Sequence, residues 1–103
     1  MAKAEVIELL KTFISILRAE GIDIDRAYLY GSYQSGTATK DSDIDILVVT
    51  ENEIADKLAG KIWRLTKEVD TKIEPFIVGK DRFESDDNSP LIEGIKRTGL
   101  KIA

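Results

Sequence analysis

The chain has 103 residues, a formal net charge of −4, and neither cysteine nor histidine. This composition excludes disulfides, Cys-His and Ser-His catalytic pairs, and zinc sites built from thiolates or imidazoles. The negative charge argues against unaided binding to nucleic acid, and no long apolar run marks a signal peptide or a membrane span. We therefore expect one cytoplasmic domain over residues 1–103, with carboxylates, hydroxyls and amines as its chemical groups.

The first third of the chain predicts a helix and a strand. Apolar residues recur at helical spacing over residues 4–20, and Gly21 ends the pattern. The aromatic-rich stretch 26–30 predicts a strand that runs directly into the turn-forming pair Gly31-Ser32.

The middle of the chain predicts a loop, a second strand and a second helix. Residues 33–42 are rich in Ser, Gly, Thr and Asp, with room for one short helical turn before a loop. A β-branched run over 44–50 predicts a strand buried on both faces, interrupted only by Asp45. Residues 53–69 carry an apolar stripe at helical spacing, which predicts a long amphipathic helix.

The last third predicts a strand at a sheet edge and a final helix. Residues 72–78 are expected to form the strand, and Pro75 places it toward a sheet edge because proline cannot donate a ladder hydrogen bond. Residues 81–88 are expected to form an acidic, solvated loop. A helix then starts at Ser89-Pro90 and ends at Gly99, before a short strand over 100–102. The predicted fold class is α+β, a small mixed sheet packed against helices in the order α-β-β-α-β-α.

Two aspartates at the start of the second strand carry the strongest chemical signal. Asp43 and Asp45 are two residues apart, so strand geometry points both carboxylates to one face and Ile44 to the other. Two anions beside an apolar run need a neutralising partner, and Mg²⁺ prefers one or two carboxylates completed by phosphate and water. The spacing therefore predicts a divalent metal site.

Gly31 and Ser32 offer backbone N–H groups and a hydroxyl to an anion, and glycine permits close approach of the ligand. If this pair and the aspartates bind one ligand, the first two strands must be antiparallel neighbours. The sequence thus predicts a phosphate site beside the metal site.

The third strand is expected to supply a further acid. A crossover helix makes it parallel to the second strand, which brings Glu74 near the aspartates. Asp70 shares its face but lies about 13 Å further back along an extended chain, so we favour Glu74. Lys40 and Lys72 are the nearest candidate cations for phosphate charge, and either could equally be a solvated lysine.

Residues 31–49, GSYQSGTATKDSDIDILVV, resemble the signature of minimal nucleotidyltransferases in the polymerase-β-like superfamily. The resemblance implies ATP or another nucleoside triphosphate as donor, two Mg²⁺ ions, and transfer of a nucleoside monophosphate to a hydroxyl. It implies phosphate binding by Gly31 and Ser32 and metal binding by Asp43 and Asp45, with Glu74 as the third acid. Small members of the family are similar to antitoxins that adenylylate a tyrosine of a HEPN-type toxin.

One position departs from the family pattern and leaves three functions open. Many members have a basic residue just before the second glycine of this loop, where this chain has Ser35. The chain could be an active transferase acting on a partner protein, or an antitoxin that acts by binding alone. A third possibility is a transferase for a small molecule, whose pocket a homodimer could build.

Four aromatic residues are expected to belong to the core or to an interface rather than to a nucleotide-stacking surface. They are Phe13, Tyr28, Tyr30 and Trp63.

Overall fold

A four-stranded mixed sheet forms the centre of the computed structural model, which describes residues 1–52, 56–85 and 89–103. In chain order the elements are α1 (Lys3–Ala19), β1 (Ile24–Tyr30), α2 (Ser32–Ser35), β2 (Ile44–Thr50), α3 (Asp56–Val69), β3 (Ile73–Gly79), α4 (Lys80–Glu84), α5 (Pro90–Thr98) and β4 (Leu100–Lys101). The predicted α+β class, the short turn after Gly31 and the short final strand are confirmed.

The strands are ordered β3-β2-β1-β4 across the sheet. β1 pairs antiparallel with β2 and with β4, while β2 pairs parallel with β3 through the crossover helix α3. Both predicted strand directions are therefore confirmed. β3, which contains Pro75, lies at a sheet edge, as the missing N–H of proline requires.

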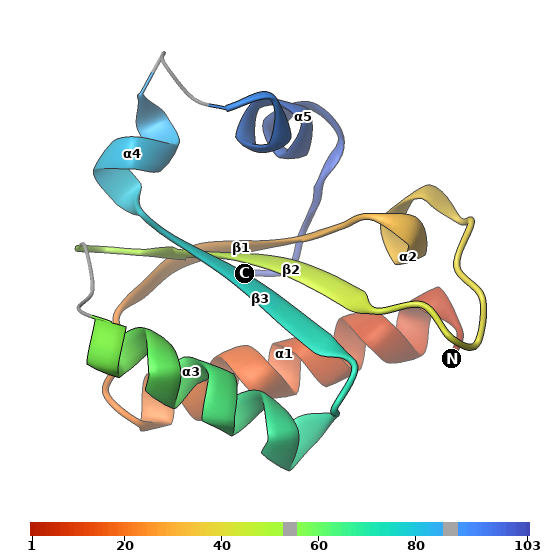
Figure 1. Ribbon diagram of the computed structural model, residues 1–103, viewed down its shortest axis with the longest axis horizontal. Coiled ribbons are helices and arrows are strands. Elements are labelled where there is room, and N and C mark those ends of the chain that lie inside the picture. Colours follow the sequence, from red (N-terminus) through yellow and green to blue (C-terminus); the bar gives the residue numbers. More distant parts are fainter. Residues whose placement is uncertain (53–55, 86–88) are drawn as a thin grey trace.

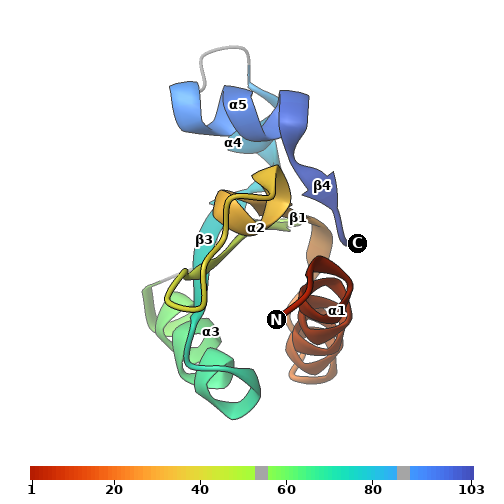
Figure 2. The ribbon, with the colours of Figure 1, turned by 90° about the vertical axis from the view of Figure 1, so that its right-hand side faces the viewer.

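Helices cover the sheet on both faces. α1 and α3 lie on one face, and α4 and α5 lie on the other, so the sheet is the middle of three layers (Figure 1, Figure 2). α2 lies at the end of the sheet where β1 finishes (Figure 1). Each face of β2 is buried beneath a different pair of helices, which explains why almost every residue of this strand is apolar.

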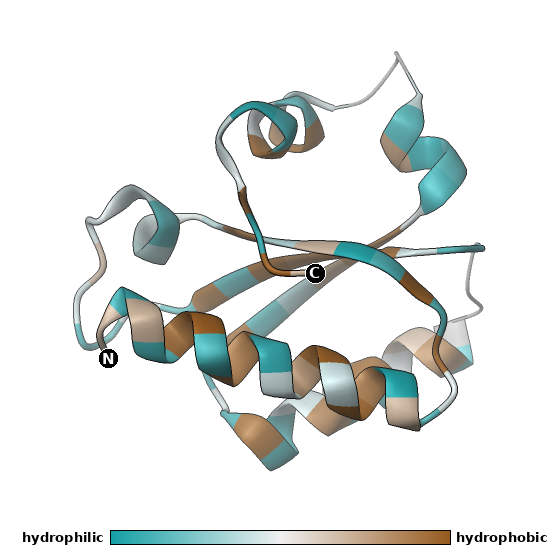
Figure 3. Cartoon of the chain, turned by 180° about the vertical axis from the view of Figure 1, so that it is seen from behind, coloured by the Kyte–Doolittle hydropathy of each residue, from teal (hydrophilic) through white to brown (hydrophobic). Residues whose placement is uncertain are grey.

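The two apolar cores follow from the alternation of side chains along β2. Ile44, Ile46 and Val48 belong to the core beneath α1 and α3. Leu47 and Val49 belong to a smaller core beneath α4 and α5. Figure 3 shows that apolar and polar residues are interspersed along α1, as expected of a helix with one face in the core.

The expected loop over 81–88 is wrong in its first half, because α4 occupies Lys80–Glu84. Phe83 explains the helix: its side chain is buried, and its ring stacks on that of Tyr28 with centroids 5.6 Å apart. One buried aromatic among polar residues gives no periodic pattern, so the sequence did not signal this helix. Residues 86–88 lie outside the described residues.

The helix expected over 53–69 is found over Asp56–Val69, and residues 53–55 lie outside the described residues. With α2, α4 and β4 included, the element order is α-β-α-β-α-β-α-α-β rather than the simpler order predicted. Of the four aromatic residues expected in a core or an interface, Phe13 is fully buried, whereas Trp63 on α3 is 42% exposed. Within the described ranges, no helix is long and apolar enough to cross a membrane.

Candidate functional site

The register of the sheet brings three acidic residues together at one end. Asp45 is paired with Glu74 on the parallel strand β3, about 4.8 Å away across the ladder. Asp43 comes two residues before Asp45 and lies on the same side of the chain. This side is also that of Leu47 and Val49, so the acids open onto the face that carries α4 and α5.

The carboxylate of Asp45 lies within electrostatic range of the other two acids. Partial burial raises the pKa of Asp45, and the negative charges of Glu74 and then Asp43 raise it further. Within the described part of the chain, no lysine or arginine forms an ion pair with any of the three acids. The site therefore carries negative charge that the protein itself does not neutralise.

Tyr30 is a site residue that the sequence placed only in a core or an interface. It is the antiparallel partner of Asp45, and its side chain is half-buried. Burial raises the pKa of its phenol, and the charges of Asp45 and Glu74 add to that increase. The sequence predicts that the first two strands are antiparallel neighbours. Aligning these strands residue by residue would have placed Tyr30 beside the acids.

Gly31 makes the closest backbone approach to the acids. Its φ of 77° and ψ of −153° lie in a region that is essentially restricted to glycine. A Cβ added there would stand 2.3 Å from Oδ2 of Asp45, which is closer than real Cβ contacts. Both the backbone conformation and the neighbouring carboxylate therefore require glycine at this position.

The turn that follows Gly31 is held in place by the buried side chain of Tyr33 and by hydrogen bonds of Ser35 within the turn. Tyr33 of α2 is buried in the core beneath α1. The Ser35 hydroxyl lies 3.3 Å from the carbonyl oxygen of Ser32 and 2.9 Å from Oγ1 of Thr37. The first amides of α2 have no acceptor within the helix, because a helix leaves its first N–H groups unpaired. Ser35 thus braces the turn instead of supplying a cation.

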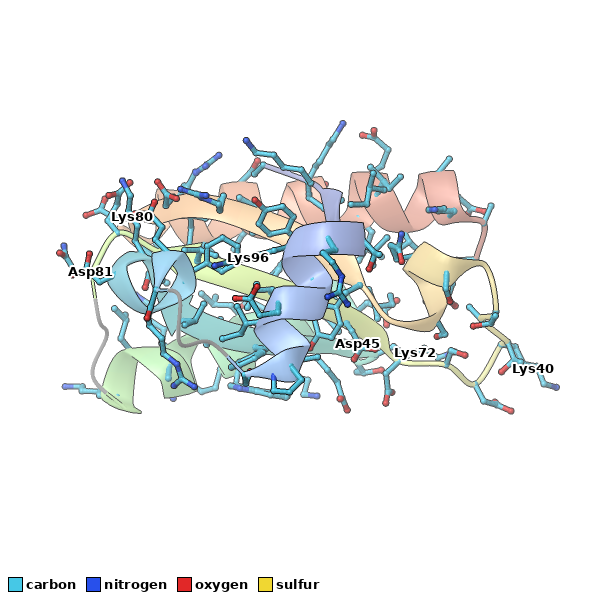
Figure 4. All side chains as sticks on the ribbon, turned by 90° about the horizontal axis from the view of Figure 1, so that it is seen from above. Lys40, Asp45, Lys72, Lys80, Asp81 and Lys96 are labelled. Atoms are coloured by element: carbon cyan, nitrogen blue, oxygen red, sulfur yellow. The ribbon has the colours of Figure 1, made fainter. Side chains whose placement is uncertain are left out.

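The candidate lysines are engaged or distant. Nζ of Lys72 donates a hydrogen bond to the carbonyl oxygen of Lys40. Lys40 is exposed, and Figure 4 shows its side chain at the tip of the loop, directed away from Asp45. The structure therefore does not bring Lys40 to the acids, and it uses Lys72 to tether the loop to the start of β3.

Asp70 is bound in the turn before β3. Its Oδ1 accepts a hydrogen bond of 2.8 Å from the backbone N–H of Lys72. Between the two acids considered for the third position, only Glu74 lies in register with Asp45.

The donor set fits a hard divalent cation. Oxygen ligands are the ones that Mg²⁺ binds, and unneutralised carboxylates attract it. Among the described residues, no three acidic side chains are already gathered closely enough to hold one ion. Mg²⁺ needs only one or two protein carboxylates when phosphate and water complete its coordination, so these acids suit a metal that arrives with a phosphorylated ligand.

Replacing Gly31 with alanine should destabilise the protein more than the same change at Gly36. Gly36 also has a positive φ, of 83°, but a Cβ there would meet no atom within 4 Å. We expect a loss of about 1 kcal/mol for Gly36→Ala, from the left-handed backbone alone. We expect about 3 kcal/mol or more for Gly31→Ala, from backbone strain and the displaced Asp45. Urea unfolding of both variants measures the difference, and equal losses would contradict the proposed contact.

Asp45→Asn should stabilise the free protein at neutral pH. A raised pKa means that the folded state disfavours the charged carboxylate. Asp45 therefore lowers the free energy of unfolding progressively as the pH rises above the unfolded pKa of an aspartate, and the full loss is reached once the pH exceeds the folded pKa. The gain from asparagine should shrink as the pH falls and vanish below about 4, where the carboxyl is protonated in both states. Thermal unfolding between pH 4 and 8 tests this, with Asp41→Asn in the exposed loop as control. A stabilisation independent of pH would be the contrary result.

Comparison with known proteins gives the family of the chain. The family model described as "Nucleotidyltransferase domain" matches residues 10–97. No curated protein sequence shows significant similarity to the chain.

Three solved structures share the fold. One is a Sulfolobus solfataricus protein provisionally assigned as a nucleotidyltransferase, with 17% identity, a TM-score of 0.61, and coverage of 79% of this chain and 73% of that one. A toxin-antitoxin structure with AMP-PNP has 21% identity and a TM-score of 0.63, and covers 100% of this chain and 73% of that one. A mutant of the toxin-antitoxin MntA-HpeT has 19% identity and a TM-score of 0.62, with the same coverage. The family match spans most of the sequence and includes the whole region from Gly31 to Glu74, so the chain belongs to the nucleotidyltransferase domain family.

Proposed function

We propose that this chain is a Mg²⁺-dependent nucleotidyltransferase that transfers AMP from ATP to a hydroxyl group of a partner protein. The observation that carries the proposal is the position of Asp45, which lies between Glu74 on β3 and Tyr30 at the end of β1, next to the turn at Gly31. Family membership supports the reaction class. The acids and the glycine turn occupy the same end of the sheet. A single ligand that carries both a metal ion and phosphate could therefore contact both.

The roles of the residues follow from their chemistry. The backbone N–H groups after Gly31 and the Ser32 hydroxyl would hold the phosphates of the donor. Asp43, Asp45 and Glu74 would hold two Mg²⁺ ions, which when bound would neutralise phosphate charge and polarise the reacting oxygens.

The reaction is an in-line displacement at the α-phosphorus of the donor. The acceptor oxygen forms a new bond to this phosphorus while the bond to the pyrophosphate oxygen breaks, and the hydroxyl proton leaves to a base. Glu74 is exposed beside Asp45 and is suited to receive that proton. The transferred nucleoside monophosphate remains on the acceptor, and pyrophosphate carries away the remaining two phosphates.

A toxin partner is the acceptor that we favour. Two of the structural neighbours are toxin-antitoxin structures, and one of these contains AMP-PNP. The family resemblance points to a HEPN-type toxin with a tyrosine hydroxyl as acceptor. Among the described residues, the site offers groups for the donor only, and a partner surface would supply the acceptor half. We expect these events in the cytoplasm, without nucleic acid or membrane.

A specific observation favours a second candidate, an antitoxin that neutralises its partner by binding alone. Ser35 stands where many relatives have a cation, and its hydroxyl is already engaged with Ser32 and Thr37. If this candidate holds, the acids are dispensable for neutralisation.

A transfer assay tests the proposal. Incubation with the partner, labelled ATP and Mg²⁺ should label the partner, and labelling should disappear when the metal is chelated. Asp43→Asn and Asp45→Asn should each lower the rate about 100-fold or more, because transition-state charge loses its stabilisation. Asp81→Asn is the matched control, since Asp81 is an exposed acid at the start of α4, away from Asp45 (Figure 4).

Three results would contradict the assignment. Labelling that survives in Asp45→Asn would overturn the metal site. Neutralisation by a variant that cannot label the partner would establish the binding-only antitoxin, and labelling of a small molecule but of no protein would establish the third function.

A further inference from the structure

A recess beneath α5 adjoins the site and has no role in the transfer chemistry described so far. It has a volume of about 300 Å³ and opens to solvent. Its lining comes from the end of β1 and from one side of α5, chiefly Tyr30, Gly31, Leu91, Gly94, Ile95 and Thr98. We refer to this recess as the α5 pocket.

We propose that the α5 pocket binds the base of the donor nucleotide, an inference that rests on the proposed function. Gly31 connects the two sites, because it lines the pocket and because a Cβ added to it would meet the carboxylate of Asp45. The nucleoside of a donor is covalently joined to its phosphates. If the phosphates lie at the turn after Gly31, the nucleoside is within reach of the pocket. The volume is at the lower end for ligand pockets, so it suits one part of a nucleotide rather than the whole molecule.

The chemistry of the lining selects the base rather than the phosphates. None of the lining residues is charged, and most of the lining surface is apolar. Leu91 is 48% exposed, which is unusual for a leucine on a helix whose neighbours Ile92 and Ile95 are buried. An aromatic base covering Leu91 would remove apolar surface from water.

Gly94 gives the pocket its depth. It lies inside α5, where glycine costs about 1 kcal/mol relative to alanine. A Cβ at this position would meet no atom within 4 Å, so neither a tight contact nor a positive φ requires glycine. Gly94 lines the pocket together with Tyr30, and the missing side chain leaves that part of the pocket open.

Thr98 supplies the polar group of the pocket. Its hydroxyl donates a hydrogen bond of 3.0 Å to the carbonyl oxygen of Gly94, which uses the hydroxyl proton. The oxygen keeps its lone pairs and can only accept a further hydrogen bond. This arrangement suits a base with an exocyclic amino group, which adenine, guanine and cytosine have and uracil lacks, and ATP meets this requirement.

The pocket suits the donor better than the acceptor. An acceptor hydroxyl must approach the α-phosphorus opposite the departing pyrophosphate, and a partner protein brings the surroundings of that hydroxyl with it. A recess walled by a helix of the nucleotide-binding chain itself instead fits a group that arrives with the phosphates.

Filling the pocket separates base binding from phosphate binding. Gly94→Leu places a side chain in the pocket without touching the core, so we expect binding of ATP with Mg²⁺ to weaken about tenfold or more. Inorganic tripolyphosphate with Mg²⁺ carries no base, and its affinity should stay within about twofold. Isothermal titration calorimetry measures both affinities on the intact chain.

Two further variants keep this test independent of folding. Gly60→Leu is the matched control, because Gly60 also lies inside a helix, α3, on the opposite face of the sheet (Figure 1). It should leave both affinities unchanged. Leu91→Ser removes the apolar wall at an exposed position, and we expect it to weaken ATP a few-fold and leave tripolyphosphate unaffected.

Each alternative outcome is distinguishable. If Gly94→Leu binds ATP like the original chain, the inference is wrong and the proposed function stands. If ATP binding persists but transfer to the acceptor is lost, the pocket receives the acceptor, which overturns the inference. Equal losses for ATP and tripolyphosphate would show a distorted phosphate site and also overturn it. If the original chain binds neither ligand, the proposed function fails, and the inference fails with it.

Discussion

The register of β2 between its two neighbours is the constraint on which the rest of the site depends. β2 runs antiparallel to β1 and parallel to β3, so the end of one neighbour and the start of the other meet at Asp45. A shift of one residue in either pairing would send Asp45 into the core beneath α1 and α3. The alternation of apolar residues along β2 fixes the register, because each face is buried against its own helices. Packing therefore positions the chemistry, because the core residues fix the strands whose ends carry the acids.

The site is built at the expense of the free protein's stability. Three acids lie together without a basic partner in the described part of the chain, and Gly31 adopts a backbone conformation that other residues avoid. Such features persist where the surrounding structure is strong enough to hold them, and they concentrate at functional sites. A nucleotide bound with a divalent cation would relieve both features, because the cation offsets the repulsion and the phosphate oxygens accept hydrogen bonds from the amides of α2. The geometry thus favours a site that is completed by its ligand.

Most of the fold and the acidic half of the site could be predicted from the sequence, because both depend on short-range periodicity. The period of two relates Asp43 to Asp45, and the crossover rule brings Glu74 to the same end. The sequence could not locate features that depend on tertiary packing. Helix α4 is anchored by the buried ring of Phe83 and by long-range ion pairs of Lys80 and Glu84. The loop position of Lys40 is set by its contact with Lys72. The pocket beneath α5 could not be predicted either, because Gly94 and Gly31 line one pocket only after the chain has folded.

The position of the metal is the most direct test of the account. Mn²⁺ can replace Mg²⁺ at oxygen ligands, and its paramagnetism broadens the NMR signals of nearby amides. With a non-hydrolysable ATP analogue present, substoichiometric Mn²⁺ should broaden the amides of Gly31, Asp45 and Glu74 first and spare those of α3. Broadening centred instead on Asp81 and Glu84 of α4, or spread evenly over the acidic surface, would contradict the claim that this end of the sheet binds metal and nucleotide.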